Sequence, residues 1–315
     1  MSVGYVWEEL YTKHYMGPQH PESPARLFAI KEVIDSFAGD KARRDLSPLE
    51  RIHPCPATKE EIAYVHDRGY IDSVECTKGN EVQLDPDTST SPDSWDAACL
   101  SAGGAIAAVD YVIGSDPYRS FAFLRPPGHH AERDHAKGFC IFNNIAIAAE
   151  HAIKKHGVKR IAILDFDIHH GNGTQNHFYD RSDVFFASTH RGRFYPGSGD
   201  LSETGEGAGK GYTINVQLNA GGGDVEFKMA WDRILPRIRK FSPELVLVSA
   251  GFDAHELDLL GGMNVTAEGF RSLAQEILKL TDDCCNGRAV FMLEGGYSLE
   301  ALQLCVRAIL EEMTA

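Results

Sequence analysis

The amino-acid sequence predicts an α/β protein in which helices cover both faces of a parallel sheet. Short runs rich in β-branched and aromatic residues alternate with segments of helical period, which is the pattern of such a sheet. Clusters of polar residues follow several of these runs, as happens where a ligand lies at the carboxyl ends of parallel strands. The predicted strands span 120–124, 160–166, 184–189, 212–218, 245–250 and 289–293.

Two helices are predicted between these strands. In segment 143–157 an asparagine precedes alanine-rich apolar spacing, basic residues fill the last turn, and Gly157 supplies a stop. Segment 266–284 begins with Thr266, a residue type that caps helices, and then repeats its apolar positions with helical spacing. Both segments are therefore expected to connect neighbouring parallel strands.

Composition limits the possible classes of protein. The chain has 315 residues, 43% of them hydrophobic, and no linker or repeat divides it, so we expect a single domain over 1–315. The first residues lack a signal-peptide pattern, and no apolar run approaches the ~20 residues that cross a bilayer. We therefore expect a cytoplasmic protein without a membrane partner.

Charge and cysteine content exclude two further kinds of function. The net charge of -14 opposes non-specific binding to nucleic acid and would suit a cationic substrate. The seven cysteines form no CxxC pair, so neither a disulfide framework nor a thiolate zinc site is indicated. We expect them to be reduced core residues.

The stretch "ILDFDIHHGNG" at 163–173 predicts a metal site. Asp167 and His169 are one residue apart, a spacing that points both side chains to the same side of an extended strand end. Asp253, just after the apolar run "LVLVSA", would add a third ligand from another strand. Two carboxylates and one imidazole leave a fourth position open, as in catalytic zinc sites, although Fe²⁺ and Co²⁺ accept the same donors. The alternative is that Asp167 caps a turn and His169 is a core histidine.

The adjacent histidines His129 and His130 predict acid–base chemistry beside that site. They follow "RPPG", a turn sequence that could present both rings to one pocket. Asp165 and Asn172 are available partners; a carboxylate stabilises an imidazolium, whereas a neutral amide leaves its histidine less basic. Unequal partners suggest unequal roles, unless one histidine is simply exposed and the other packed in the core.

Aromatic residues near the expected site have two interpretations. Tyr297 follows two glycines in "LEGGYSLEAL", and its hydroxyl could donate a hydrogen bond to an oxyanion. Phe139 and Tyr195 could form the walls of a channel. Each of the three could equally be a packed core residue.

Six motifs, in this order and spacing, resemble those of the histone deacetylase family. They are "RPPGHHA", "GFCIFNN", "DFDIHHGNGT", "YPGSGD", "SAGFDAH" and "LEGGY", and "HPESPARL" at 20–27 resembles the N-terminal signature of the family. The resemblance therefore spans nearly the whole chain. It implies the arginase-deacetylase fold, a three-layer α/β/α domain with a mainly parallel eight-stranded sheet, and a catalytic Zn²⁺. Asn172 matches the class II-like branch and its bacterial amidohydrolase relatives, and Tyr297 stands where some class II enzymes carry His, which implies a catalytically complete enzyme.

The resemblance also implies roles for individual residues. His130 matches the general base and acid, His129 its electrostatic partner, and Tyr297 the hydroxyl that polarises the carbonyl, with Asp165 and Asn172 as partners of the two histidines. Leu260 matches a gate position at which an apolar residue favours acyl-lysine over polyamines. The zinc ligands implied by the resemblance are Asp167, His169 and Asp253. A structural K⁺ site is implied at Asp165, Asp167, His169, Ser188 and Thr189. The implied substrate positions are Gly138, Phe139, Tyr195 and Asp87.

The predicted reaction is the hydrolysis of an N-acyl amide, with an acetylated lysine of a peptide or protein as the expected partner. An acetylated polyamine or another small amine would use the same machinery. A binuclear manganese hydrolase is a further alternative, although Asn172 and His255 occupy positions where such a site prefers acids. A non-catalytic protein that binds acyl-amines is the alternative outside the enzymes. Neither the physiological substrate, the acyl length nor the oligomeric state follows from the sequence.

Overall fold

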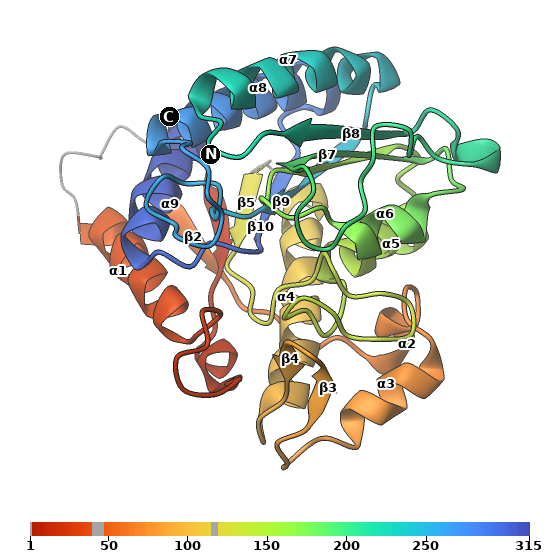
Figure 1. Cartoon of the computed structure of the whole chain (residues 1–315), viewed down its shortest axis with the longest axis vertical. Helices are drawn as coiled ribbons and strands as arrows, with labels where there is room; N and C mark the ends of the chain where they lie inside the picture. Colours follow the sequence, from red (N-terminus) through yellow and green to blue (C-terminus); the bar gives the residue numbers. More distant parts are fainter. Residues whose placement is uncertain (1, 40–46, 115–118) are drawn as a thin grey trace.

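An eight-stranded sheet forms the centre of the computed structural model, which describes residues 2–39, 47–114 and 119–315 (Figure 1). Every pair of neighbouring strands in this sheet is parallel, and the spatial order is β2-β1-β5-β10-β9-β6-β7-β8. The strands are β1 (Val3–Val6), β2 (Leu49–Ile52), β5 (Arg119–Ala122), β6 (Ile161–Asp165), β7 (Val184–Arg191), β8 (Thr213–Leu218), β9 (Leu245–Ala250) and β10 (Ala289–Leu293).

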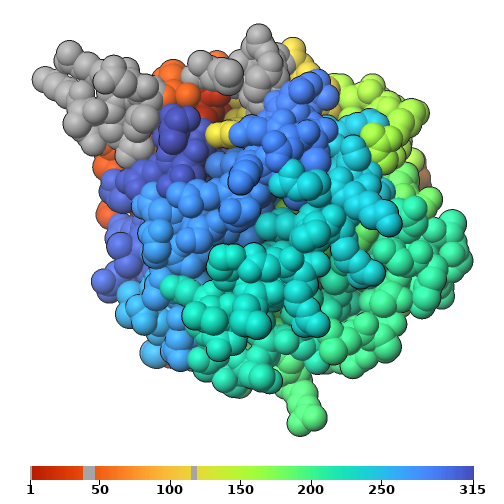
Figure 2. Space-filling model, turned by 90° about the horizontal axis from the view of Figure 1, so that it is seen from above, coloured from red at the N-terminus to blue at the C-terminus, as the bar shows by residue number. Residues whose placement is uncertain are grey.

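Helices cover both faces of the sheet, which gives the predicted three layers. On one face lie α4 (Ser94–Gly114), α5 (Asn144–His156) and α6 (Asn172–Phe178). On the other lie α7 (Asp224–Phe241) and α8 (Ala267–Cys285), with α9 (Leu299–Thr314) beside α8 and α1 (Ala25–Gly39) beside α9. Seen from above, the segments coloured from teal to blue cover much of this second face (Figure 2). The smaller elements are η1 (Glu9–Lys13), α2 (Lys59–Ile62), α3 (Arg68–Glu75), η3 (Gly207–Gly209) and the two-stranded sheet of β3 (Gln83–Asp85) and β4 (Thr88–Ser89).

All six predicted strands are present, and their ends differ from the predicted ones by two residues at most. The central strands β6, β9 and β10 are buried along their whole length, as the continuous apolar runs indicated. The strands β1 and β2 were not predicted from the sequence. The strand β2 lies at the sheet edge and reads "LERI", in which no residue is buried, so it carries no continuous apolar run.

The predicted helix ends are confirmed by their capping contacts. The side chain of Asn143 accepts the backbone N–H of Ala146 at the start of α5, and Gly157 ends that helix with a φ of 69°. The side chain of Thr266 accepts the N–H of Gly269 at the start of α8. These caps set where each helix stops and the next strand can begin.

The helix α4 corrects the expectation that no apolar run is long enough to span a membrane. It has 21 residues, and a window of it reaches a mean hydropathy of 1.5, which suffices by length and composition alone. Serine, glycine and aspartate interrupt its larger apolar residues, so it did not stand out as a run. In the structure 72% of that window is buried, because α4 packs against α5, β1 and β5.

The cysteines also require a correction. All seven are free thiols, as expected, and four of them are buried. Cys55 and Cys76, however, are exposed, so the expectation of seven core residues was wrong for these two. Cys55 lies in the connection between β2 and α2, and Cys76 is the C-cap residue of α3.

Candidate active site

Four segments that follow β5, β6, β9 and β10 meet at the carboxyl edge of the sheet. The backbone N–H of Ile168, after β6, donates to Oδ1 of Asp253, after β9, over 2.9 Å. The N–H of Gly295, after β10, donates to Oδ2 of Asp167 over 2.8 Å. The ring of His129, after β5, contacts Asp165 at the end of β6. The predicted convergence of these distant segments is therefore present in the structure.

Asp167, His169 and Asp253 form one compact cluster, in which one potential ligand atom of each lies within 4.8 Å of the others. Nδ1 of His169 lies 3.0 Å from Oδ1 of Asp167 and 3.1 Å from Oδ2 of Asp253. The reason for this proximity differs from the predicted one. The strand ends at Asp165, and a turn in which Oδ1 of Asp167 accepts the N–H of His169 brings the two side chains together.

The chemistry of this cluster fits a divalent cation. Both carboxylates are fully buried, and apart from the nearby Nδ1 of His169 no donor satisfies Oδ2 of Asp253. Burial, and then the charge of Asp167, raise the pKa of Asp253. Burial opposes a charge on His169, but the two adjacent carboxylates raise its pKa to about 10. Two buried carboxylates around one imidazole thus require a positive charge, and a metal ion with oxygen and nitrogen ligands supplies it.

His129 is held by a carboxylate. Its Nδ1 lies 3.0 Å from Oδ2 of Asp165, and both side chains are buried. Burial disfavours the charged ring, but the nearby carboxylates, that of Asp165 foremost, raise the pKa of His129 to about 10. Its backbone N–H also donates to Glu294, over 3.1 Å. His129 is therefore fixed in place and favoured as an imidazolium.

His130 has a neutral partner instead. Its Nδ1 lies 2.7 Å from Oδ1 of Asn172. Burial, and then the neighbouring His129 and His169, lower the pKa of His130 well below its ordinary value. The Nδ2 group of Asn172 donates to Oε1 of Glu132 over 2.5 Å, which leaves its oxygen facing the ring. This environment favours a neutral imidazole, and with Nδ1 donating to Asn172 its Nε2 would be the nitrogen that can accept a proton.

A cavity of about 230 Å³ leads to these residues from the surface. The ring of Phe139 meets that of Tyr297 edge-on at 5.9 Å, and the ring of Tyr195 meets that of His130 edge-on at 5.1 Å. Burial, and then Asp253, raise the pKa of the Tyr297 hydroxyl, so it stays protonated and can donate. The lining residues are Asp87, His130, Gly138, Phe139, His169, Phe194, Tyr195, Leu260 and Tyr297, and all but Phe194 were singled out from the sequence.

Several residues at this edge were missed. Phe194 stacks on the ring of His169 at 5.2 Å, and the aromatic character of "RFYPGSGD" was the available signal. Asp258 is buried and its Oδ2 accepts the N–H groups of Tyr297 and Ser298 over 2.6 and 3.1 Å. Its Oδ1 accepts the N–H of Leu260 over 3.0 Å. Asp258 therefore connects the loop that carries Leu260 (the gate loop) to the loop that carries Tyr297 (the tyrosine loop). No sequence spacing signals a contact between such distant loops.

A cluster of buried charged side chains holds the backbone of the loop that carries Tyr297. Nε and Nη2 of Arg26 donate to the backbone oxygens of Gly296 and Glu294 over 2.6 and 2.5 Å. Glu22 pairs with both Arg26 and Arg125, and all three side chains are fully buried. The segment "HPESPARL", in the N-terminal part of the chain, thus binds the backbone of the loop that carries Tyr297.

The structure brings together some of the residues of the predicted potassium site. Asp165 pairs in register with Ser188 across β6 and β7, so the two are neighbours. The hydroxyl of Thr189 is buried and has no hydrogen-bond partner. Binding of K⁺ by Asp165, Asp167, His169, Ser188 and Thr189 stays a prediction.

Comparison with known proteins identifies the family. Residues 20–313 match the histone deacetylase domain. Histone deacetylase 14 (chloroplastic) of Arabidopsis thaliana is 41% identical, over 93% of this chain and 73% of that protein. The histone deacetylase-like amidohydrolase of Pseudomonas aeruginosa is 39% identical, over 94% of this chain and 77% of that protein.

A solved structure agrees with this result. The crystal structure of the HDA15 HD domain matches with a TM-score of 0.91 and 36% sequence identity, over 99% of this chain and 88% of that one. The fold predicted from the sequence is thus shown, as is the relation to bacterial amidohydrolases. The chain belongs to the histone deacetylase family, a family of deacetylase hydrolases.

Proposed function

We propose that the protein is a zinc-dependent amidohydrolase that removes acetyl or related acyl groups from lysine side chains. One observation carries the proposal: a single narrow cavity has His130, His169 and Tyr297 in its lining, next to two buried carboxylates. A base, a hydrogen-bond donor and a cation-binding cluster around one point are what amide hydrolysis requires.

Asp167, His169 and Asp253 would hold the zinc ion. Bound there, the ion would polarise the acyl carbonyl and lower the pKa of a water molecule. The hydroxyl of Tyr297 would also donate to the carbonyl oxygen, and this hydrogen bond would strengthen as negative charge develops on that oxygen. Gly295 donates to Asp167, and Ile168 to Asp253, so the backbone holds both carboxylates in position.

The two histidines have different roles: His130 carries out both proton transfers, and His129 acts through its charge. Neutral His130 accepts a proton from the attacking water and then gives it to the leaving amine. His129 stays charged through its pairing with Asp165 and stabilises the negative charge that builds up nearby. Asn172 orients the ring of His130 and, because it carries no charge, raises the basicity of that ring less than a carboxylate would, so the proton can leave again.

The shape of the cavity favours an acyl-lysine substrate. Phe139, Phe194, Tyr195 and Leu260 give it mainly apolar walls, which suit the methylene chain of lysine. Leu260 is 47% exposed at the entrance and carries no charge that would select a polyamine. Asp87 lies in the same lining and could accept an N–H from a peptide backbone. A small acetylated amine is the second candidate, because it needs only the inner part of this cavity.

The test is a substrate panel run with Zn²⁺ and with chelator. We expect hydrolysis of acylated lysine peptides, slower hydrolysis of acetylputrescine, and loss of both with chelator. Faster turnover of acetylputrescine would favour the small-amine alternative. Binding without turnover in the presence of Zn²⁺ would indicate a non-catalytic acyl-amine protein.

Metal analysis of the active protein tests the manganese alternative. Among the described residues at this edge, the grouped ligands are Asp167, His169 and Asp253 alone. Asn172 is bonded to His130, and Nδ1 of His255 accepts the N–H of Leu257. Two manganese ions per chain at this edge would contradict the proposed zinc site.

A further inference from the structure

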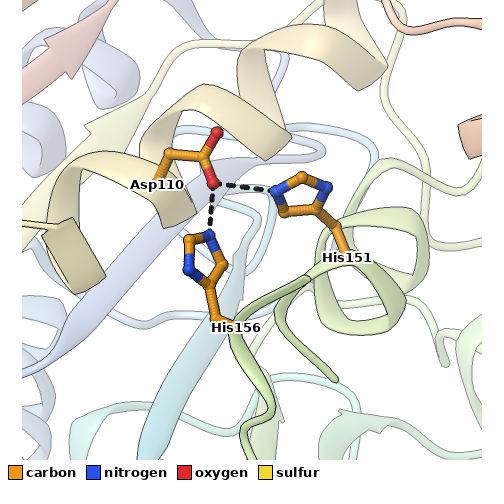
Figure 3. Close-up of side chains that lie close together, drawn as sticks. All are labelled: Asp110, His151 and His156. Carbon is orange, nitrogen blue, oxygen red and sulfur yellow. Dashed lines mark hydrogen bonds and ion pairs between the residues drawn. The ribbon is translucent and has the colours of Figure 1, made fainter. Parts of the chain in front are cut away.

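A second cluster of potential metal ligands lies between the helices α4 and α5 (Figure 3). Asp110 projects from α4, and His151 and His156 project from α5 towards it. Nε2 of His151 lies 2.8 Å, and Nε2 of His156 2.6 Å, from the same oxygen, Oδ1 of Asp110. Two imidazoles from one helix thus converge on one carboxylate of another.

This cluster is at the opposite edge of the sheet from the candidate active site. The helix α5 ends at His156, just before β6 begins at Ile161, and Asp110 is in the last part of α4, before β5 begins. The catalytic candidates instead follow the carboxyl ends of the strands. Each helix carries a partial negative charge at its C-terminal end, which favours a cation near both. An ion bound here would contact neither the substrate nor the cavity.

Hydrogen bonding alone does not account for all polar atoms of the cluster. A carboxylate only accepts, so both rings must donate through Nε2 when no ion is bound. Nδ1 of His151 is then an acceptor, and it is buried without a hydrogen-bond partner. An ion bound to Nε2 would leave the ring proton on this Nδ1, which would then donate to an acceptor such as a buried water molecule.

The geometry can accommodate an ion after a small movement. Ligand atoms of a tetrahedral zinc site are about 3.3 Å apart, given zinc–ligand bonds of roughly 2.0–2.2 Å. The present separations of 2.6 and 2.8 Å must therefore widen by about 0.5 to 0.7 Å. The side chain of His151 is only 8% exposed and acts as the fixed point, whereas those of Asp110 and His156 are 48% and 28% exposed. These two can move outward at little cost.

We propose that Asp110, His151 and His156 form a second, structural metal site that binds Zn²⁺ or a similar divalent transition ion and joins α4 to α5. Two imidazoles and one carboxylate suit Zn²⁺, Co²⁺, Ni²⁺ or Cu²⁺ rather than Ca²⁺ or Mg²⁺, which prefer oxygen ligands. A water molecule would take the fourth position. The site is independent of the proposed catalytic zinc.

Equilibrium dialysis against Zn²⁺ with metal analysis tests this proposal on the full chain. We compare the wild type with Asp110→Asn and His156→Gln, which keep the size and polarity of each side chain. His53→Gln is the matched control, because His53 also lies beside a carboxylate, Glu8, at 3.4 Å, but is 72% exposed and has no second histidine. Circular dichroism and peptide hydrolysis verify that each variant is folded.

We expect the wild type and His53→Gln to bind one more zinc ion per chain than Asp110→Asn and His156→Gln. Added Zn²⁺ should also raise the melting temperature of the first pair more than that of the second, because an ion that binds only the folded state stabilises it. The difference of one ion persists even if the catalytic site binds no zinc, so the two proposals fail separately. Equal zinc content and equal thermal shifts in all four proteins would show that the cluster is only hydrogen-bonded and would overturn the proposal.

Discussion

The substitution Gly295→Ala tests whether the two buried carboxylates hold the metal ion. Gly295 follows β10, and a Cβ atom built on it would lie 2.3 Å from Oδ2 of Asp253 and 2.6 Å from Oδ2 of Asp167. Real Cβ atoms essentially never come closer than 3.0 Å to such atoms, so the nearer oxygen must retreat by about 0.7 Å. Metal–ligand distances tolerate only about 0.2 Å, so the ligand geometry is lost.

The expected result is a folded protein with weak metal binding. Overpacking at this position should cost about 1–3 kcal/mol, which is less than the stability of a typical domain, about 5–15 kcal/mol. Disturbing even the groups that support a ligand weakens metal binding by about 10- to 100-fold, so we expect a loss near 100-fold when the ligands themselves move. Hydrolysis should fall accordingly at limiting zinc and recover in part at high zinc.

The assay is a zinc titration against a competing chelator, followed by peptide hydrolysis at each zinc concentration. Gly69→Ala is the matched control, since it makes the same change at an exposed helical position where nothing lies within 4 Å of the added Cβ. If Gly295→Ala bound zinc and hydrolysed substrate like the wild type, the assignment of Asp167 and Asp253 as ligands would be refuted.

Three further predictions concern Tyr297, Asp258 and Glu22. Tyr297→Phe should keep its zinc content and lose about 10²–10³-fold in kcat, because one oxyanion donor is removed; unchanged steady-state kinetics would contradict its role. Asp258→Asn should lower kcat about 10- to 100-fold at unchanged zinc affinity. The amide has only one oxygen to accept hydrogen bonds, so a charge-assisted hydrogen bond worth about 1.5–3 kcal/mol is lost on one side of the residue. Zinc titration and steady-state kinetics together check this. Burial opposes the charge of Glu22, but Arg125 and then Arg26 lower its pKa from 4.5 to about 2. The charged Glu22 therefore stabilises the folded protein fully above pH 4.5, and this stabilisation disappears as the pH falls through 2. Urea unfolding of Glu22→Gln should therefore show a loss of about 3–5 kcal/mol at neutral pH that shrinks between pH ~4.5 and ~2, and a loss independent of pH would be the contrary result.

Much of the fold could be predicted because local patterns agree with the final structure. The buried strands β6, β9 and β10 read as continuous apolar runs, and Asn143, Gly157 and Thr266 terminate helices through contacts within one turn. The strands β1 and β2 were missed because neither reads as a continuous β-branched or aromatic run: β1 contains a glycine, and the edge strand β2 has two charged residues and none that is buried. The helix α4 was not recognised as a long apolar segment because its hydrophobic character is spread over small residues.

The residues that meet at the candidate site could be identified for the same reason. Each candidate follows a strand directly, and parallel strands end at one edge, so Asp167, His169 and Asp253 had to meet if the sheet was predicted correctly. The turn at Asp167, however, is set by its own hydrogen bond to His169 and not by strand alternation. The sequence therefore indicated which residues come together, but the reason it offered was wrong for this pair.

The sequence by itself determined the parallel α/β architecture, the residue types of the site and the family, because these depend on local periodicity and on ordered motifs. The tertiary structure alone decided which histidine faces Asp165 and which faces Asn172, that Asp258 connects the gate loop to Tyr297, and that two histidines of α5 converge on Asp110. These contacts join residues far apart in the chain, and their geometry arises only when the sheet and its helices pack together.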